Sequence, residues 1–202
     1  ETDNDTWKDA YVFAERALAK ERIIFEEDTF RDVMLKKTGI EIARLSCLGA
    51  IALSDIQMKE CSAKASEYCY NYAANCIERS RKVLEEIGNR NMVLVTNFYG
   101  NIHTVLRAYG LDRFFDNVVE SAVVGVKKPD PAIWRLGIKA AGREAAECIA
   151  IGDSFDKDIA AAQAAGCRTI WFKGQEWTPA KHHEAQPGQT VTALTQLLDI
   201  LQ

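Results

Sequence analysis

The chain has few prolines and histidines and no long hydrophobic run. Its four prolines all follow residue 128. Such a distribution suits a helical first half, because proline inside a helix removes a hydrogen bond and clashes with the preceding turn. The three histidines show no metal-ligand spacing. Every apolar stretch is much shorter than the roughly 20 residues that a membrane helix needs, so we expect no membrane partner.

The cysteines and the charge exclude further classes of protein. The six cysteines form no Cys-x-x-Cys pair and lack the spacing of a zinc site. They are interpreted as small buried apolar residues, for which a reducing cytoplasm is the natural setting; we therefore expect a cytoplasmic protein. A net charge of -4 gives no reason to expect nucleic acid as a partner. The hydrophobic content of 48% and the charged content of 27% are those of an ordinary soluble globular protein.

The first half of the chain predicts a helical lobe. Hydrophobic residues recur at helical spacing from Trp7, from Phe30 to a stop near Gly39, over 42–52, and over 61–87. We expect these four helices to form a bundle-like domain over residues 1–85.

From residue 91 the hydrophobic pattern changes its period. Short apolar runs rich in β-branched residues alternate with helical patterns, which predicts a parallel, doubly wound (Rossmann-like) sheet with right-handed crossovers. The fold class is therefore α/β, with an α/β core over residues 86–202 that follows the helical lobe. The expected strands are 92–96, 117–120, 148–151 and 168–172, and the expected helices lie near 101–109, 131–141, 157–165 and 191–201.

The most informative segment is the turn Gly152-Asp153-Ser154 with Asp158 five residues after Asp153. An apolar strand leads into this turn, so Asp153 lies at the carboxyl end of a strand, the edge where open α/β sheets bind ligands. Carboxylates are the hard oxygen ligands that Mg²⁺ takes, together with water and substrate phosphate. Taken alone, Asp153 is equally well interpreted as the cap of the next helix.

Two more strand ends carry polar residues in a matching order. Thr96 and Asn97 follow the first expected strand, and Lys128 precedes Pro129-Asp130-Pro131 at the start of a helix. A hydroxyl or amide can bind a phosphoryl oxygen, and a lysine ammonium offsets negative charge. Singly, Thr96-Asn97 suits a helix cap and Lys128 a solvated surface. The ordered set of three strand-end loops favours one common site.

This ordered set resembles the haloacid dehalogenase (HAD) superfamily of hydrolases, helical-cap subgroup. Thr96-Asn97 resembles its second motif, Lys128 its third, and Gly152-Asp153-Ser154 with Asp158 its fourth. The resemblance runs from about residue 83 to 172, and it implies that the helical lobe is an inserted helical-bundle cap. It implies catalytic roles for Thr96, Lys128, Asp153 and Asp158, substrate binding by Thr96, Asn97 and Lys128, and a Mg²⁺ ion held by Asp153.

The first motif of that superfamily, an apolar strand followed by Asp-x-Asp with the nucleophile, has no counterpart in the chain. Asp3 and Asp5 have the right spacing, but no apolar strand precedes them and Trp7 stands where Thr or Val is expected. We interpret Asp3 or Asp5 as the cap of the helix that starts near Trp7. The missing strand would leave a slot about 9–10 Å wide between the second-motif and fourth-motif strands. We therefore expect a strand bearing Asp-x-Asp upstream of Glu1, and direct pairing of 93–96 with 148–151 would contradict this.

The resemblance implies a Mg²⁺-dependent phosphohydrolase acting on a small phosphate ester through an aspartyl phosphate. Two alternatives stay open. A metal-free haloacid dehalogenase has little reason to place the extra charge of Asp153 near its nucleophile. A non-catalytic protein that binds phosphorylated ligands has little reason to keep Thr96, Lys128 and Asp153 together.

Overall fold

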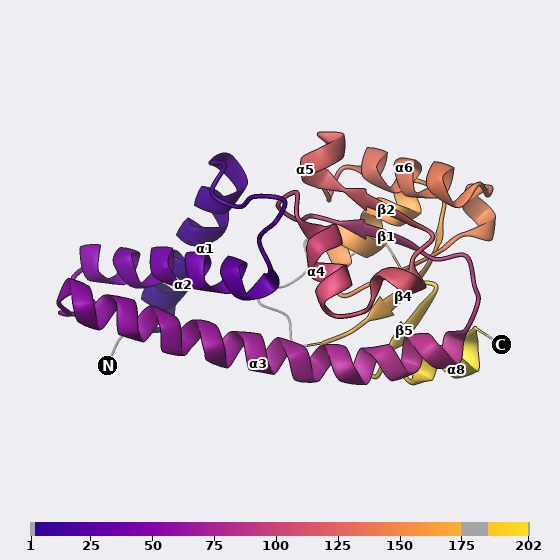
Figure 1. Cartoon of the computed structure of the whole chain (residues 1–202). Helices are drawn as coiled ribbons and strands as arrows, with labels where there is room; N and C mark the ends of the chain where they lie inside the picture. Colours follow the sequence, from indigo (N-terminus) through magenta and orange to yellow (C-terminus); the bar gives the residue numbers. More distant parts are fainter. Residues whose placement is uncertain (1–2, 175–185, 202) are drawn as a thin grey trace. The chain divides into compact units, whose positions relative to one another are not determined.

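The computed structural model describes residues 3–174 and 186–201, and Figure 1 labels its elements. The chain forms two compact units. Unit 1 consists of residues 1–78 and 99–110, and unit 2 of residues 79–98 and 111–202. The border between them falls within one helix, α3 (Asp55–Ile87). The expected division into domains 1–85 and 86–202 stays a prediction.

Unit 1 is helical. It contains α1 (Asn4–Lys20), α2 (Phe30–Cys47), the first part of α3 and α4 (Ile102–Ala108). The side chain of Asp3 accepts a hydrogen bond from the Thr6 amide at 2.7 Å and so caps α1, which confirms that this aspartate is a helix cap. Thr29 and Asp32 form a reciprocal capping box at the start of α2. Two apolar clusters form the core, one around Leu45 and one around Val33.

The expectation of two helices between Phe30 and residue 52 was wrong. A single helix, α2, runs through Gly39 to Cys47. Glycine within a helix costs only about 1 kcal/mol relative to alanine, and the backbone of Gly39 is not in the left-handed conformation that ends a helix. The left-handed residue is Gly49, with a φ of 68°, just after the helix end.

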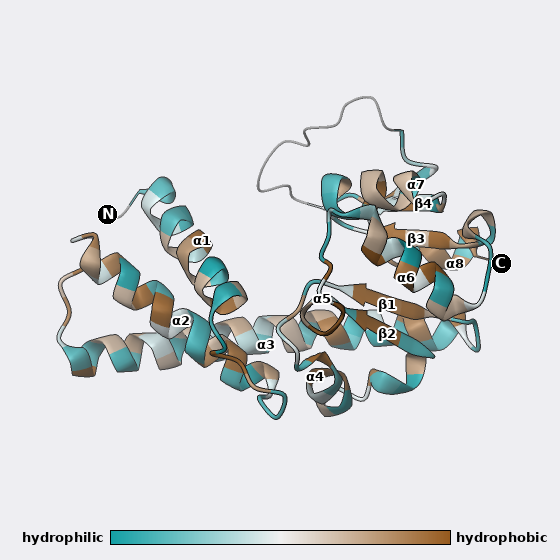
Figure 2. Cartoon of the chain, turned by 90° about the horizontal axis from the view of Figure 1, so that it is seen from above, coloured by the Kyte–Doolittle hydropathy of each residue, from teal (hydrophilic) through white to brown (hydrophobic). Residues whose placement is uncertain are grey.

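Unit 2 is an α/β unit built on parallel strands. The strand β1 (Val93–Thr96) pairs in parallel with β2 (Asn117–Glu120), and β4 (Arg168–Phe172) pairs in parallel with β3 (Ile149–Gly152) and β5 (Gln189–Val191). These elements confirm the expected α/β class. Figure 2 shows β1 and β3 among the most hydrophobic parts of the chain. The helical elements of unit 2 are η1 (Asp112–Phe114), α5 (Ser121–Val124), α6 (Pro131–Ala141), η2 (Ala145–Glu147), η3 (Phe155–Ala160), α7 (Ala161–Ala164) and α8 (Gln196–Ile200), besides the end of α3.

The C-terminal part differs from the expected helix over 191–201. Residues 189–191 form β5, and α8 begins only at Gln196. The Gln196 side chain accepts hydrogen bonds from the amides of Thr192 and Ala193 at 2.8 and 3.0 Å. These contacts hold the residues before α8 in a turn, so the apolar pattern there belongs to a strand, a turn and a short helix.

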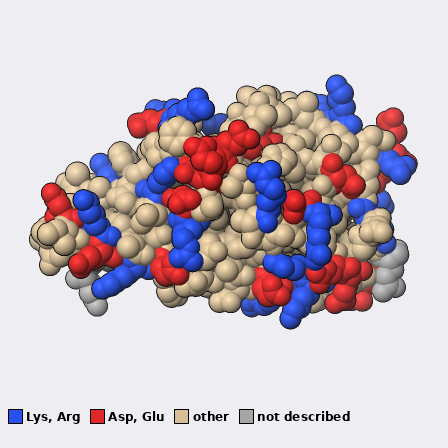
Figure 3. All heavy atoms as spheres, in the orientation of Figure 1, with Lys and Arg blue, Asp and Glu red and all other residues tan. Residues whose placement is uncertain are grey.

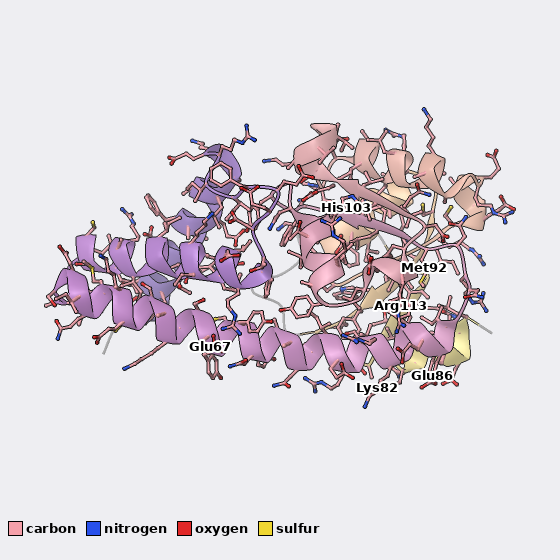
Figure 4. The ribbon with its side chains drawn as sticks, viewed as in Figure 1. Glu67, Lys82, Glu86, Met92, His103 and Arg113 are labelled. Carbon is pink, nitrogen blue, oxygen red and sulfur yellow. The ribbon has the colours of Figure 1, made fainter. Side chains whose placement is uncertain are left out.

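The strands β1 and β3 are not paired with each other in the described residues. Each has a ladder on one edge only, β1 with β2 and β3 with β4. Residues 93–95 of β1 and 149–151 of β3 instead line a common cavity of about 680 Å³, which we call the strand cleft. Met92, labelled in Figure 4, lies on its lining directly before β1. The pairing that would contradict an additional strand is therefore absent from the described residues, and the expected strand itself stays a prediction.

Charged side chains of both signs lie on the surface, as the small net charge of the sequence indicates. Acidic and basic side chains are interspersed over the face shown in Figure 3. Within residues 3–174 and 186–201, no helix combines the length and the apolar character that crossing a membrane requires.

Candidate active site

The site is built at the carboxyl end of β3, where Gly152 makes room for Asp158. A Cβ atom on Gly152 would lie 2.3 Å from the Cβ of Asp158, so only glycine permits this approach. The chain then turns into η3, a π-helical segment in which the Ser154 carbonyl accepts from the amides of Asp158 and Ile159 at 2.8 and 3.3 Å. Wide turns of this kind often occur at functional sites. Here the turn directs the Asp158 carboxylate back to the end of the strand.

Lys128 and Asp158 form the central ion pair. The Lys128 Nζ lies 2.7 Å from Asp158 Oδ1, and the two side chains are 16% and 4% exposed. The other oxygen, Asp158 Oδ2, accepts from the Ser154 amide at 3.0 Å. Lys128 Nζ also lies 5.8 Å from the centre of the Trp134 ring, within the range of a cation–π contact. Through the Asp158 carboxylate, two hydrogen bonds therefore connect the Lys128 ammonium to the backbone amide of Ser154, the residue directly after Asp153.

Asn97 ties the end of β1 to the lysine loop. Its Nδ2 donates to the Lys128 carbonyl at 3.0 Å, and its Oδ1 accepts from the Lys128 amide at 2.9 Å. Both the oxygen and the nitrogen of this side-chain amide thus bind the backbone of Lys128, which makes Asn97 a positioning residue. The expected contact of Asn97 with substrate stays a prediction.

The Thr96 hydroxyl and the Asp153 carboxylate form no hydrogen bond with another described side chain. Asp153 is exposed directly after β3, and its backbone carbonyl accepts from Trp171 Nε1 at 3.1 Å. No described residue donates a hydrogen bond to its carboxylate or to the Thr96 hydroxyl. Both groups stand at strand ends whose loops meet at Lys128, so both are available to a ligand.

The carboxylates of Asp153 and Asp158 can hold Mg²⁺ only if water and a bound phosphate supply further oxygen ligands. Within the described residues, no group of three or more His, Cys, Asp or Glu side chains is arranged to hold a metal. Asp158 is committed to Lys128, which leaves Asp153 as the available carboxylate. Mg²⁺ usually takes one or two carboxylates and completes its octahedron with water and substrate phosphate. The donor set suits that mode of binding.

Sequence reasoning missed several residues that shape the site. Trp171 packs edge-on against Phe155 with ring centroids 5.2 Å apart and holds the Asp153 carbonyl. Trp134 donates to the Lys157 carbonyl at 3.3 Å. Glu120, only 3% exposed, ends β2 opposite Thr96. A tryptophan in an apolar run gives no signal of such a contact. The carboxylate of Glu120 directly after Val118 and Val119 was a usable signal.

A family model described as haloacid dehalogenase-like hydrolase matches residues 5–166, which include Thr96, Asn97, Lys128, Asp153 and Asp158. The chain belongs to this hydrolase family. The resemblance inferred from three strand-end motifs is therefore confirmed, and the match also includes the helical region, where the motifs gave little information.

Curated relatives of this HAD-like chain include phosphatases. Glyceraldehyde 3-phosphate phosphatase of Pyrococcus furiosus is 36% identical over 93 residues, which are 46% of the chain and 39% of that protein. Phosphoserine phosphatase of Thermus thermophilus is 39% identical over 62 residues, or 31% of the chain and 25% of that protein. The chain thus spans less than half the length of these relatives.

Solved structures share the fold. A HAD hydrolase of Bacillus subtilis, described as bound to magnesium, superposes with a TM-score of 0.55 at 20% identity and covers 96% of the chain and 92% of its own. A dehalogenase superposes with a TM-score of 0.61 at 17% identity and covers 97% and 81%. At these identities the likeness shows the fold alone and does not separate the two chemistries.

Proposed function

We propose that the protein is a Mg²⁺-dependent phosphohydrolase that acts on a small phosphorylated metabolite. The observation that carries the proposal is the fixed Lys128–Asp158 pair, held beside the exposed and unengaged Asp153 carboxylate. A site of this composition supplies one positive side chain and one metal-binding carboxylate, which a phosphate ester requires. The phosphatases among the relatives support the same substrate class.

The residues of the chain take distinct roles in this proposal. Lys128 binds a non-bridging phosphoryl oxygen and offsets the charge that gathers there. The Thr96 hydroxyl donates to a second phosphoryl oxygen. Asp158 orients the Lys128 ammonium, and Asn97 fixes the backbone on which it stands. Asp153 would hold Mg²⁺, which when bound supplies further positive charge to the phosphoryl group.

The reaction requires a nucleophile, and we assign it to an aspartate on a strand lying between β1 and β3. Its carboxylate oxygen forms a bond to phosphorus while the ester P–O bond breaks, and the second aspartate of the Asp-x-Asp pair would donate the proton with which the alcohol leaves. Water then attacks the phosphorus of the aspartyl phosphate, and inorganic phosphate leaves. Dividing the reaction into these steps is ordinary covalent catalysis by a carboxylate. The unpaired edges of both strands support this placement.

A dehalogenase is the second candidate, because a dehalogenase shares the fold. That chemistry displaces halide without a metal, and a carboxylate beside the nucleophile would then only add repulsion. The exposed Asp153 thus favours the phosphatase. A protein that only binds phosphorylated ligands is the third.

The test uses the product of the complete gene and a generic aryl phosphate that releases a coloured phenol. We expect colour with Mg²⁺ and none after chelation. Asp153→Asn should lower turnover by about a hundredfold or more, as loss of a key electrostatic group does. Asp199→Asn, an exposed aspartate on α8, is the matched control and should retain activity. Turnover that is changed neither by removal of Mg²⁺ nor by Asp153→Asn would exclude the proposal. A folded protein with no turnover on any phosphate ester would favour the protein that only binds phosphorylated ligands.

A further inference from the structure

Two of the six cysteines lie side by side at the amino ends of β3 and β4. The ladder between these parallel strands begins with Ile149 opposite Arg168. One step earlier, the Arg168 amide donates to the Cys148 carbonyl at 3.1 Å. Cys148 and Cys167 are therefore the next partners in the same register. They are far apart in the sequence, so their spacing gave no sign of this pairing.

The side chains of Cys148 and Cys167 lie on the same face of the sheet. Both pack into one apolar cluster together with Ala150. Ile149, which lies between Cys148 and Ala150, packs into a different cluster with Ile170, as expected from the alternation of side chains along a strand. The pairing uses the edge of β3 that faces β4, so it does not depend on a strand between β1 and β3.

Partner residues on neighbouring strands have the spacing of a disulfide bond. The Cα atoms of such partners lie ~4.8 Å apart, and a disulfide joins Cα atoms that are roughly 4.4–6.8 Å apart. Both thiols are free in the structure. Burial raises the pKa of each thiol, so the protonated pair is the resting form near neutral pH. Cys148 is half-buried and Cys167 is buried, which makes Cys148 the thiol that a reagent reaches first.

We propose that Cys148 and Cys167 are a redox modification site, at which a low-molecular-weight disulfide oxidises the two thiols to a disulfide bond between β3 and β4. The Cys148 thiolate attacks one sulfur of the reagent and releases the first reagent thiolate. The Cys167 thiolate then attacks the Cys148 sulfur of this mixed disulfide and releases the second. The two released thiolates take up the two protons of the cysteines, and the reagent gains the two electrons that the pair loses. Because the second step is intramolecular, it gains from proximity.

The bond encloses the segment that carries the carboxylates of the candidate active site. Asp153 and Asp158 both lie between Cys148 and Cys167 in the sequence. A disulfide stabilises a protein mainly by restricting its unfolded chain. For a loop of this length, Tm should rise by roughly 5–10 °C on oxidation. The site does not rest on the proposed phosphatase activity, so the two can fail separately.

The test incubates the folded, reduced chain with oxidised glutathione at about pH 8.5, where thiolates are more abundant than at neutral pH. The remaining thiols are then blocked with N-ethylmaleimide in urea at mildly acidic pH, which prevents further exchange. Peptides are mapped by mass spectrometry without reduction. We expect a cross-link between Cys148 and Cys167, the loss of two blocked thiols, and the rise in Tm. An excess of dithiothreitol should reverse all three.

A matched pair of variants separates this site from general cysteine reactivity. Cys167→Ala removes the second thiol, so the reaction should stop at a glutathione adduct on Cys148, with no gain in Tm. Cys69→Ala removes an exposed cysteine of α3 and should leave the cross-link unchanged.

The map of the unsubstituted protein decides the proposal even where Cys167→Ala fails to fold. A folded chain that forms no cross-link between Cys148 and Cys167 would overturn it. So would a glutathione adduct that persists on Cys148 while Cys167 is present, or a cross-link that forms only in urea. None of these readouts requires a phosphate ester.

Discussion

At Gly152 the absence of a side chain determines where a functional carboxylate can lie. The sequence indicated a tight turn before Asp153, but it did not indicate that Asp158 returns to within van der Waals distance of Gly152. Spacing along a chain cannot show this, because the π-helical turn of η3 changes which side chains face the strand end. The pairing of Lys128 with Asp158 was inferable, since opposite charges converge at neighbouring strand ends. The engagement of Asn97 with a backbone was not, since an amide binds backbone and ligand equally well.

Gly152→Ala should displace Asp158 and weaken its contacts with Lys128 and the Ser154 amide. We expect a loss of about 1–3 kcal/mol in the free energy of unfolding, as for other overpacked sites. Turnover should fall by about tenfold for each 1.4 kcal/mol of lost transition-state stabilisation. Urea unfolding and aryl phosphate hydrolysis measure the two effects.

The control for that variant is Gly39→Ala. A Cβ atom on Gly39 would meet nothing within 4 Å, and the residue lies inside α2, so alanine should stabilise the protein by roughly 0.5–1 kcal/mol. If Gly152→Ala were as stable and active as Gly39→Ala, the close approach of Asp158 would be wrong.

Lys128→Met should be strongly destabilising, because it leaves the Asp158 carboxylate, 4% exposed, without its counter-ion. Breaking a buried pair in this way typically costs about 3–5 kcal/mol. The double variant Lys128→Met/Asp158→Asn removes both charges and should recover much of that loss, while turnover stays absent. A double-mutant cycle from thermal unfolding gives the coupling; independent, additive effects of the two substitutions would contradict the ion pair.

At the scale of elements, β-branched runs were the most reliable signal. The four expected strands coincide with β1 to β4 within a residue at each end, because short buried strands are bounded by polar turns. The strand β5 was missed, since its three residues, Gln189–Val191, are mostly polar and exposed. Gly39 was taken for a helix end because composition does not show whether a glycine adopts a positive φ.

The start of α6 supports the lysine loop. Asp130 accepts from the Ala132 amide at 2.8 Å and caps a helix with Pro131 in its first turn. Asp130→Ala should cost about 1 kcal/mol of stability and also lower turnover, because the loop that holds Lys128 loses its attachment. Steady-state kinetics and urea unfolding measure both.

Asp3→Ala is the matched control, since Asp3 caps α1 by the same kind of bond but lies outside the proposed site. It should destabilise its helix and leave kcat unchanged. Equal kinetic effects of the two cap variants would show that the contribution of Asp130 is only to overall stability.

For the whole molecule, composition and pattern gave the class of fold, and the strand cleft is the feature that they predicted only indirectly. The slot was expected because the resemblance implied a strand that the chain does not supply. The strand cleft is open because α6 packs closely against β1. At this contact a Cβ atom on Gly137 would lie only 2.7 Å from the side chain of Val95. Such close packing fixes β1 in position without a neighbour on its second edge.

The cysteines provide a prediction about the chain as a whole. All six are free, but the interpretation of all of them as buried was wrong, since Cys47 and Cys69 are exposed and only Cys167 is fully buried. Burial raises the pKa of Cys167 to about 11, which disfavours the reactive thiolate. Below pH 9, alkylation by iodoacetamide should therefore modify the exposed Cys47 and Cys69 and spare Cys167 until unit 2 unfolds. Because folding raises this pKa, the stability that the neutral thiol contributes is complete below about pH 9 and is lost as the pH rises through about 11. Peptide mapping after alkylation, with and without urea, measures the order of modification; Cys167 reacting as fast as Cys47 in the folded protein would contradict its burial.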